Sequence, residues 1–330
     1  MMSHFAHVIP IHMLEQKKIV NVVPKGVELI QAPELWKETK GEGITVAVLD
    51  TGCDVNHPDL KDRVIGGRNF TDDDDGRPEI LQDYNGHGTH VSGTIAASEN
   101  NKGIVGVAPG CNLLIVKVLN KNGAGQYDWI IKGINYAVEQ KVDIISMSLG
   151  GPVDHPELHE AVRDAVNKNV LVVCAAGNEG DGEESSDEYA YPGRYNEVIC
   201  VGAINYDRRY PDFTNSHDEI DLVAPGVEIL STHLNGRYAV LSGTSMAAPH
   251  VSGALALIKV AANKHFARPL SESELYAQLV KRTVPLGFSA KIEGNGVVYL
   301  TAPERLARIF DEEDKKELIK ACLASGVLNA

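Results

Sequence analysis

The stretch Ile44-Thr45-Val46-Ala47-Val48-Leu49 is followed at once by Asp50-Thr51-Gly52, so an apolar run ends abruptly in a polar turn. Short runs that are continuously rich in Val, Ile and Leu are typical of strands buried on both faces of a sheet. Four later runs have the same form, at residues 113–119, 142–147, 170–176 and 198–203. We therefore predict a buried sheet in which 44–49 is one strand.

Segments with helical periodicity lie between and after these runs, at 127–140, 156–167, 245–262 and 271–281. In the last of them, Ser271 and Glu274 have the spacing of a capping box. Strands that alternate with helices predict an α/β fold with a mostly parallel central sheet and helices on both faces. Ligands of such sheets bind beyond the carboxyl ends of the strands.

Composition narrows the class of protein. The 330 residues are 43% hydrophobic and 23% charged, which excludes a disordered chain, a collagen-like fibre or a coiled-coil rod. The formal charge of -14 has the wrong sign for nucleic acid or an anionic membrane surface, so we expect neither as a partner. No linker divides the chain. We expect one domain over 26–302, an N-terminal extension over 1–25 and a charged tail over 303–330.

The chain has five cysteines, an odd number that is thinly spread, and we interpret them as reduced. Cys174 lies inside an apolar run and is expected to be a core residue. Residues 1–18 have no basic leader followed by an apolar segment and a cleavage site, and no later stretch has 18 uninterrupted apolar residues. We therefore expect a cytoplasmic protein.

Four polar residues occupy positions where a parallel sheet places its site. Asp50 and Asn178 each follow a predicted buried strand. His87 lies between Gly86 and Gly88, where a sharp turn leads into a helix, and Ser245 begins another helix. Each has an ordinary alternative when taken alone: Asp50 could bond nearby amides, Ser245 could be an N-cap, and Asn178 could form a turn.

His90, three residues after His87, suggests a metal pair. A zinc protease motif of the HExxH type, however, needs a glutamate where this chain has Gly88. We therefore expect His90 to have a structural role.

Together the four residues supply the parts of nucleophilic acyl transfer. Ser245 would attack, His87 would take its proton, and Asp50 would orient His87. Asn178 and the Ser245 amide would stabilise the oxyanion. The chain order Asp, His, Ser differs from the chymotrypsin order and from that of the α/β-hydrolases.

Five motifs stand in the order of the subtilisin family of serine endopeptidases, which the chain resembles from about Gly41 to Ala302. They are AVLDTG around Asp50, NGHGTHVSGT around His87, SMSLGG at 146–151, AAGNEG around Asn178 and GTSMAAPHVSGALAL around Ser245. More narrowly, the chain resembles the intracellular subtilisins of bacilli, since it has neither a secretion signal nor a long propeptide. The segment VIPI at 8–11 is similar to the LIPY-type motif of that subgroup and departs from it at Ile11.

The resemblance implies a subtilisin-like fold and a serine endopeptidase of fairly broad specificity that acts on protein and peptide substrates. Ser148, Leu149 and Gly150 would pair with bound peptide and form a wall of the S1 pocket, and we add Gly177 to this substrate-binding set because it leaves the backbone beside Asn178 open. A homodimer formed through the tail after Pro303 is also suggested.

The resemblance also implies a structural Ca²⁺ site. Asp59 would supply a carboxylate, Asn100 a side-chain oxygen, and the loop 98–104 its main-chain carbonyls, all of them hard oxygen ligands. The expected carbonyl ligands are Ser98, Lys102 and Ile104. The acidic run 72–75 has no alternating ligand geometry, and we expect it to be a solvated loop.

An intracellular protease needs a restraint, and the N-terminal segment is the candidate. Val8, Ile9 and Ile11 could lie as an added strand along the substrate cleft, with Pro10 bending the chain away from Ser245. The alternative is a frayed terminus.

Two other classes of protein compete with the protease. A catalytically silent peptide-binding relative is one, although every expected catalytic residue is present. A nucleotide-binding domain is the other, although the chain has neither a GxGxxG after the first strand nor a P-loop.

Overall fold

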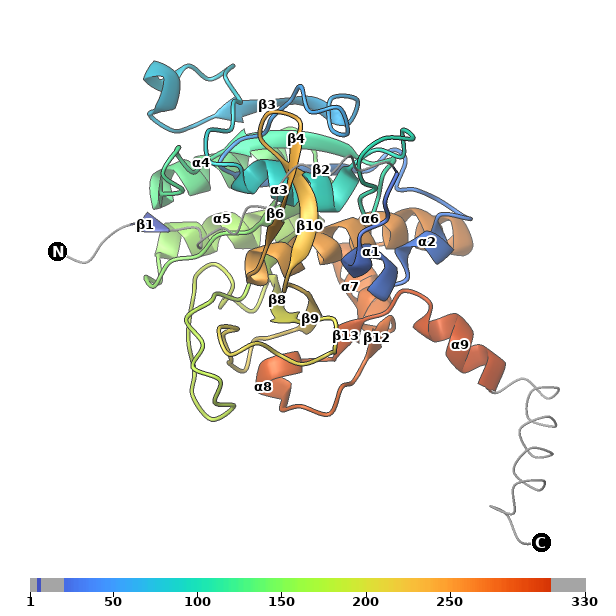
Figure 1. Ribbon diagram of the computed structural model, residues 1–330. Helices are drawn as coiled ribbons and strands as arrows, with labels where there is room; N and C mark the ends of the chain where they lie inside the picture. Colours follow the sequence, from blue (N-terminus) through green and yellow to red (C-terminus); the bar gives the residue numbers. More distant parts are fainter. Residues whose placement is uncertain (1–4, 7–20, 310–330) are drawn as a thin grey trace, which may run out of the picture.

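A nine-stranded sheet forms the centre of the protein in the computed structural model, which describes residues 5–6 and 21–309 (Figure 1). Its strand order is β12 (Thr283–Val284), β13 (Val297–Val298), β9 (Leu222–Pro225), β8 (Ile199–Ile204), β7 (Leu171–Ala175), β6 (Ile144–Met147), β2 (Thr45–Asp50), β4 (Asn112–Lys117) and β3 (Val64–Asn69). Neighbouring strands run parallel except β12 and β13. The predicted mostly parallel α/β sheet is confirmed.

Helices cover both faces of the sheet, as predicted (Figure 1). One face packs against α3 (His87–Ala96), α6 (Thr244–Phe266) and α7 (Glu272–Val280), and the other against α4 (Tyr127–Glu139) and α5 (Pro156–Asn167). Alternate residues of β2 supply the two cores. Val46 and Val48 belong to the first, and Ala47 and Leu49 to the second. An apolar run of this kind is therefore what a two-sided strand requires.

Helix α6 passes through the first core. By length and composition alone it could span a membrane, but 83% of its most apolar window is buried inside the protein. It is therefore a core helix. It begins at Thr244, one residue before the predicted start, and runs four residues past the predicted end.

The helix α7 has the predicted capping box. The Ser271 side chain accepts a hydrogen bond from the Glu274 amide, and the Glu274 carboxylate accepts one from the Ser271 amide.

The remaining elements are short. Strands β10 (Ile229–His233) and β11 (Arg237–Leu241) form a hairpin, and β1 (Phe5–Ala6) pairs with β5 (Gly125–Gln126). The others are α1 (Lys25–Leu29), α2 (Ala32–Leu35), the 3₁₀ turn η1 (Asp73–Gly76), α8 (Ala290–Glu293) and α9 (Ala302–Ile309). The VIPI segment at 8–11 and the tail beyond 309 lie outside the described residues.

Strand β2 lies where the connections change direction. From β2 the chain goes to β3 at the sheet edge and returns through α3 to β4, which lies beside β2. It then crosses through α4 to β6 on the other side of β2. The carboxyl end of β2 is therefore a topological switch point, where α/β sheets bind their ligands. Asp50 is the last residue of this strand.

Candidate active site

Asp50 and His87 meet at the switch point. Nδ1 of His87 lies 2.7 Å from Oδ1 of Asp50, and both side chains are almost fully buried. The same carboxylate oxygen accepts a 2.7 Å hydrogen bond from the Thr51 amide. Glycine is required beside His87, because a Cβ on Gly88 would overlap the carbonyl oxygen of Gly52. The structure thus brings these two predicted site residues together at the end of β2 and the start of α3.

The imidazole of His87 has one nitrogen bonded and the other available. Its Nε2 is buried and has no hydrogen-bond partner among the described residues. Burial opposes protonation, but the charge and hydrogen bond of Asp50 and the charge of Asp83 outweigh it, so the pKa of His87 is raised. His87 is therefore both oriented by a carboxylate and able to accept a proton at Nε2.

Ser245 is the second residue of α6 and is 5% exposed. Its Oγ donates a 3.1 Å hydrogen bond to the carbonyl oxygen of Ser148, and the Ser148 hydroxyl donates in return to the carbonyl oxygen of Ser245 at 2.9 Å. The N-cap position of α6 belongs to Gly243, so the alternative of Ser245 as an N-cap is wrong. In the described arrangement no hydrogen bond joins the hydroxyl to His87.

Asn178 is fixed against the start of α6. Its Oδ1 accepts hydrogen bonds from the amide of Thr244 at 2.8 Å and from the Thr244 hydroxyl at 3.2 Å. Its Nδ2 makes no hydrogen bond within the described residues, so two amide protons remain available. The preceding Gly177 has a φ of +112°, and a Cβ there would overlap the Asn215 amide. The Asn178 side chain therefore connects the loop after β7 to the first residue of α6.

The predicted substrate-binding segment Ser148–Gly150 continues directly from β6 without joining a ladder. Leu149 is 2% exposed and packs in the second core. An isolated antiparallel bridge between Gly151 and Tyr191 holds the end of the segment. The segment adjoins Ser245, since Ser148 and Ser245 exchange hydroxyl-to-carbonyl hydrogen bonds.

Asp59 gathers the residues of the predicted calcium loop. It is fully buried, and its carboxylate accepts hydrogen bonds from the Asn100 amide at 3.0 Å, the Ile104 backbone amide at 3.1 Å and the Tyr238 hydroxyl at 2.9 Å. The Ser98 amide donates to the carbonyl oxygen of Asp59. No cationic side chain of the described residues pairs with this carboxylate. Asp59, Ser98, Asn100 and Ile104 thus converge, and Lys102 contributes a backbone amide bonded to Asn100.

The structure describes no cluster of three or more His, Cys, Asp or Glu side chains that could hold a metal. The predicted calcium set contains one carboxylate, one side-chain amide and backbone carbonyls, so it is not a cluster of that kind. In the described arrangement the Asp59 carboxylate accepts from N–H and O–H donors, and the side-chain oxygen of Asn100 accepts from the Lys102 amide.

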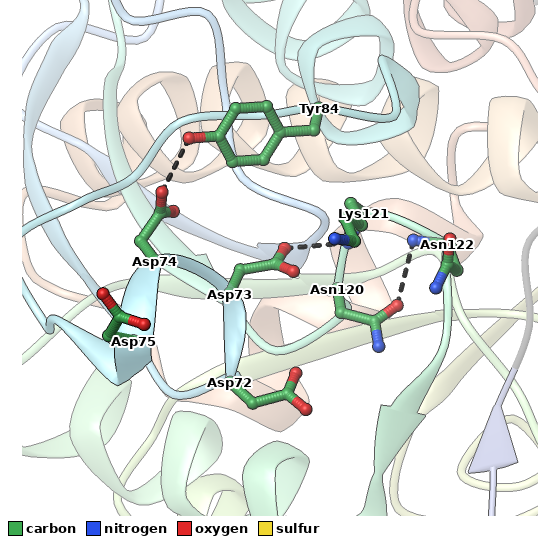
Figure 2. Close-up of a pocket in the computed structure, with 8 residues that line it drawn as sticks. All are labelled: Asp72, Asp73, Asp74, Asp75, Tyr84, Asn120, Lys121 and Asn122. Atoms are coloured by element: carbon green, nitrogen blue, oxygen red, sulfur yellow. Dashed lines mark hydrogen bonds between the residues drawn. The ribbon is translucent and has the colours of Figure 1, made fainter.

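The acidic run 72–75 is only partly a solvated loop, which corrects the prediction (Figure 2). Asp73 is buried and forms a 2.8 Å ion pair with the fully buried Lys117 at the end of β4. Its carboxylate also accepts from the Lys121 amide, while Asp74 accepts from the Tyr84 hydroxyl. The run thus neutralises a buried lysine, because a charge so deep in the fold needs a partner.

Two residues outside the catalytic set have the structural roles that were expected. His90 is buried, its Nε2 bonds the carbonyl oxygen of Ile229 at 2.9 Å, and burial lowers its pKa to about 3. Cys174 is fully buried in the second core, where burial raises the pKa of its thiol.

One residue of the site was missed. Asp83 is 1% exposed and accepts five hydrogen bonds around the turn that leads into His87. In the sequence it is a single acid in a polar loop, and its one signal is its position four residues before His87.

The described residues contain a buried, hydrogen-bonded pair of Asp50 and His87 at the carboxyl end of β2, and Ser245 in the first turn of α6. The model of the subtilase family matches residues 41–301, and the chain belongs to this family. The resemblance found in the sequence is confirmed, and with it the expected class of enzyme, a serine endopeptidase of the subtilisin type.

Named relatives are similar over most of the chain. The intracellular serine protease of Paenibacillus polymyxa is 67% identical over 312 residues, covering 94% of this chain and 96% of that protein. The major intracellular serine protease of Bacillus subtilis (strain 168) is 63% identical over 301 residues, covering 91% and 94%. Subtilisin E of the same strain is 46% identical over 237 residues, which are 72% of this chain and 61% of that protein.

Proposed function

We propose that this subtilase is a cytoplasmic serine endopeptidase that cleaves proteins and peptides through an acyl-enzyme, with Ser245, His87 and Asp50 as its triad. The observation that carries the proposal is the buried 2.7 Å contact between Asp50 and His87, which leaves Nε2 of His87 unbonded. The names of the two intracellular relatives support the location.

The mechanism follows from these contacts. The Nδ1–H of His87 donates to Asp50, so Nε2 carries the lone pair that takes the proton from Ser245. For this step the Ser245 hydroxyl turns from the Ser148 carbonyl toward Nε2. The raised pKa of His87 favours uptake of the proton. The Ser245 oxygen then attacks the scissile carbonyl, and His87 returns the proton to the leaving amine.

The oxyanion that forms in this attack would lie at the start of α6. Backbone amides in the first turn of a helix have no partner within the helix, and the helix dipole favours negative charge there. Nδ2 of Asn178 and the Ser245 amide are the two donors we assign to it. Because Thr244 holds Oδ1 of Asn178, the amide group presents its protons and not its oxygen.

A fluorophosphonate probe tests the nucleophile. We expect a form that begins near Val22 to be labelled once, at Ser245, with loss of peptide hydrolysis, and its Ser245→Ala variant to be neither labelled nor active. Ser148→Ala removes a neighbouring hydroxyl of similar burial and serves as the matched control, which should still be labelled. Absence of labelling in this shortened form would favour the alternative class, a silent peptide-binding protein.

We further propose that Ca²⁺ stabilises the fold at the loop 98–104. Asp59 and Asn100, with the carbonyl oxygens of Ser98, Lys102 and Ile104, would hold it. The buried Asp59 carboxylate without a cationic partner supports this, since an unpaired buried charge is costly and a bound cation would neutralise it. The ion would supply charge compensation to the loop and take no part in hydrolysis.

We also propose that the protein is made as a zymogen whose N-terminal segment blocks the cleft. Support comes from the antiparallel pairing of β1 with β5, Phe5 opposite Gln126 and Ala6 opposite Gly125. An extended chain added to an exposed strand is a common mode of peptide binding. The segment of this chain before residue 22 thus already has one strand contact outside the main sheet.

Finally, we propose that the tail after Pro303 supports a homodimer. Its first helix, α9, projects from the body of the protein (Figure 1). On this helix Leu306 is 54% exposed, an apolar side chain that a second copy could cover. Light scattering should give twice the chain mass at micromolar concentration, and removal of residues 303–330 should halve it. A monomeric parent would overturn the proposal.

A further inference from the structure

Asp83 lies at the centre of the turn that carries His87. Its Oδ1 accepts from the Thr51 hydroxyl at 2.9 Å and from the amides of Asn85 and Gly86 at 2.9 and 2.8 Å. Its Oδ2 accepts from the Thr89 amide at 3.0 Å and the Thr89 hydroxyl at 2.7 Å. The carboxylate therefore bonds the backbone on both sides of His87.

The same carboxylate reaches the strand that carries Asp50. Thr51, which follows Asp50, donates its hydroxyl to Asp83 and accepts the Gly88 amide on that hydroxyl at 2.9 Å. Asp83 thus joins the end of β2 to the start of α3, the two elements whose separation sets the contact between Asp50 and His87. A fully bonded carboxylate at such a junction leaves the helix start little freedom.

The charge of Asp83 also acts on His87. Asp83 is 1% exposed, and no cationic side chain of the described residues forms an ion pair with it. The negative charge of Asp83 therefore acts on the imidazole of His87 and, together with the charge of Asp50, raises the pKa of His87. A negative charge in a buried environment stabilises a cation more than it would in water.

The other titratable groups around His87 are neutral near pH 7. His90, on the same helix, has a pKa lowered by burial to about 3. His233, from β10, packs against Gly86, and burial lowers its pKa as well. Asp50 and Asp83 are thus the two charges that face His87.

We propose that Asp83 is a positioning residue for hydrolysis: its carboxylate fixes His87 against Asp50 and stabilises the imidazolium that forms when His87 takes the proton of Ser245. The inference rests on the proposed function, in which His87 is the base. Asp83 itself touches neither the hydroxyl nor the substrate. The effect on geometry should appear in kcat, and the effect on charge should appear in the acid limb of the pH profile, so the two can be measured separately.

The variant Asp83→Asn removes the charge and places an amide where donors already converge. We expect kcat to fall about tenfold to hundredfold, since a small misplacement of a catalytic group has costs of this order, with KM little changed. The acid limb of the pH profile of kcat/KM should move to lower pH, because His87 loses one source of stabilisation for its protonated form. A merely structural role would not move that limb.

Two variants serve as controls. Asp54→Asn removes another buried carboxylate of the same region, which bonds the Asn56 and Gly236 amides, and should leave kcat and the acid limb unchanged. Thr51→Val keeps the charge of Asp83 but cuts the link to β2, so kcat should fall while the acid limb stays.

A direct titration separates this inference from the proposed function. In the Ser245→Ala background, which has no activity to lose, NMR of labelled histidine should give a lower titration midpoint for His87 when Asp83→Asn is added. A cooperatively folded Asp83→Asn with the kcat and acid limb of the parent would overturn the proposal. If that variant does not fold, Asp83→Glu replaces it: the charge remains but the oxygens shift, so a kcat equal to the parent's would overturn the positioning role.

Discussion

The side-chain oxygen of Asn178 accepts a 2.8 Å hydrogen bond from the backbone amide of Thr244, the residue that precedes Ser245. This bond fixes which end of the Asn178 amide group is held by the protein and which remains free. It also ties the loop after β7 to the start of α6. The position of the free Nδ2 therefore depends on the same helix that carries the hydroxyl.

Replacing Asn178 should affect the rate and not substrate binding. Loss of one oxyanion donor lowers kcat by about 10²–10³ in a subtilisin, and we expect Asn178→Ala to do the same here with little change in KM. Steady-state kinetics on a chromogenic peptide measures both. The control is Thr244→Val, which removes the hydroxyl contacts but keeps the backbone bond to Asn178, and its kcat should fall less. An unchanged kcat for Asn178→Ala would remove it from the mechanism.

Buried histidines should make the fold sensitive to acid. Burial lowers the pKa of His90 to about 3 and those of His217 and His250 to about 4, all below the ordinary 6.5. Between pH 6.5 and 4 the unfolded chain therefore binds protons that the folded protein does not. The free energy of unfolding should fall as the pH falls, by about 1.4 kcal/mol per pH unit for each such histidine.

The raised pKa of His87 acts in the opposite direction, since its stabilising contribution is full below pH 6.5 and is lost as the pH rises through its folded pKa. Below pH 6.5 the contribution of His87 is constant, and the group that opposes the three histidines there is Asp221, whose pKa burial raises to about 6. Three groups outweigh one, so the free energy of unfolding should still fall with the pH. Urea unfolding of Ser245→Ala at several pH values measures the slope. His250→Gln should reduce it, and the exposed His265 on the same helix gives the control, His265→Gln. A stability that does not change from pH 6.5 to 4.5 would contradict the prediction.

Calcium should stabilise the folded protein by mass action. A ligand that binds only the folded state adds about 2.7 kcal/mol at one hundred times its Kd. The Tm of Ser245→Ala, which cannot digest itself, should therefore rise with free Ca²⁺ and fall when a chelator is added.

A matched pair of variants places the ion. Asp59→Asn should abolish the response of Tm to Ca²⁺, whereas Asp62→Asn, an exposed acid three residues later, should keep it. Comparison of each variant in chelator separates the loss of the ion from any damage to the fold. A Tm indifferent to both calcium and chelator would exclude a stabilising site.

The sequence predicts those strands that are buried on both faces of the sheet. Strand β2 packs into a core on each face, so the residues Val46 to Leu49 are all apolar and form a run that is visible in the sequence. Strand β3 lies at the sheet edge and contains Gly66 and Gly67, so it carries no apolar run. In β10 the buried Ser231 and Thr232 donate to the carbonyls of α3, and a polar pair gives no strand signal.

The sequence predicts a candidate site residue only where its neighbours along the chain distinguish it. Asp50, His87 and Asn178 stand at strand ends or between glycines, which local sequence reveals. Asp83 binds amides of its own turn and the Thr51 hydroxyl 32 residues earlier, a partnership that exists only after folding. Asp73 was misjudged for the same reason, because its partner Lys117 comes from a distant strand.

The N-terminal segment should inhibit the protease, and this is the prediction that most concerns its biology. The pairing of Phe5 and Ala6 with β5 places the chain antiparallel on a strand that follows directly from the 120–124 turn. Such pairing gives main-chain affinity, and apolar side chains that follow it, Val8 and Ile9, would add contacts in the cleft. Pro10 has no N–H and a fixed φ, so it would bend the chain away from Ser245 and make the segment resist cleavage.

The test compares the full-length protein, freshly purified and confirmed by mass as unprocessed, with a version that begins near Val22. Both are assayed on a short chromogenic peptide with calcium present, and the shorter protein should have the higher initial rate. The synthetic peptide of residues 1–21 should inhibit the shortened enzyme when added in trans, which distinguishes occupation of the cleft from an effect on folding. Pro10→Ala full-length protein should process itself faster than the parent, because the bend that protects the segment is gone. Equal initial rates for the long and short forms would show that the segment is not an inhibitor, and equal processing rates would show that Pro10 does not protect it.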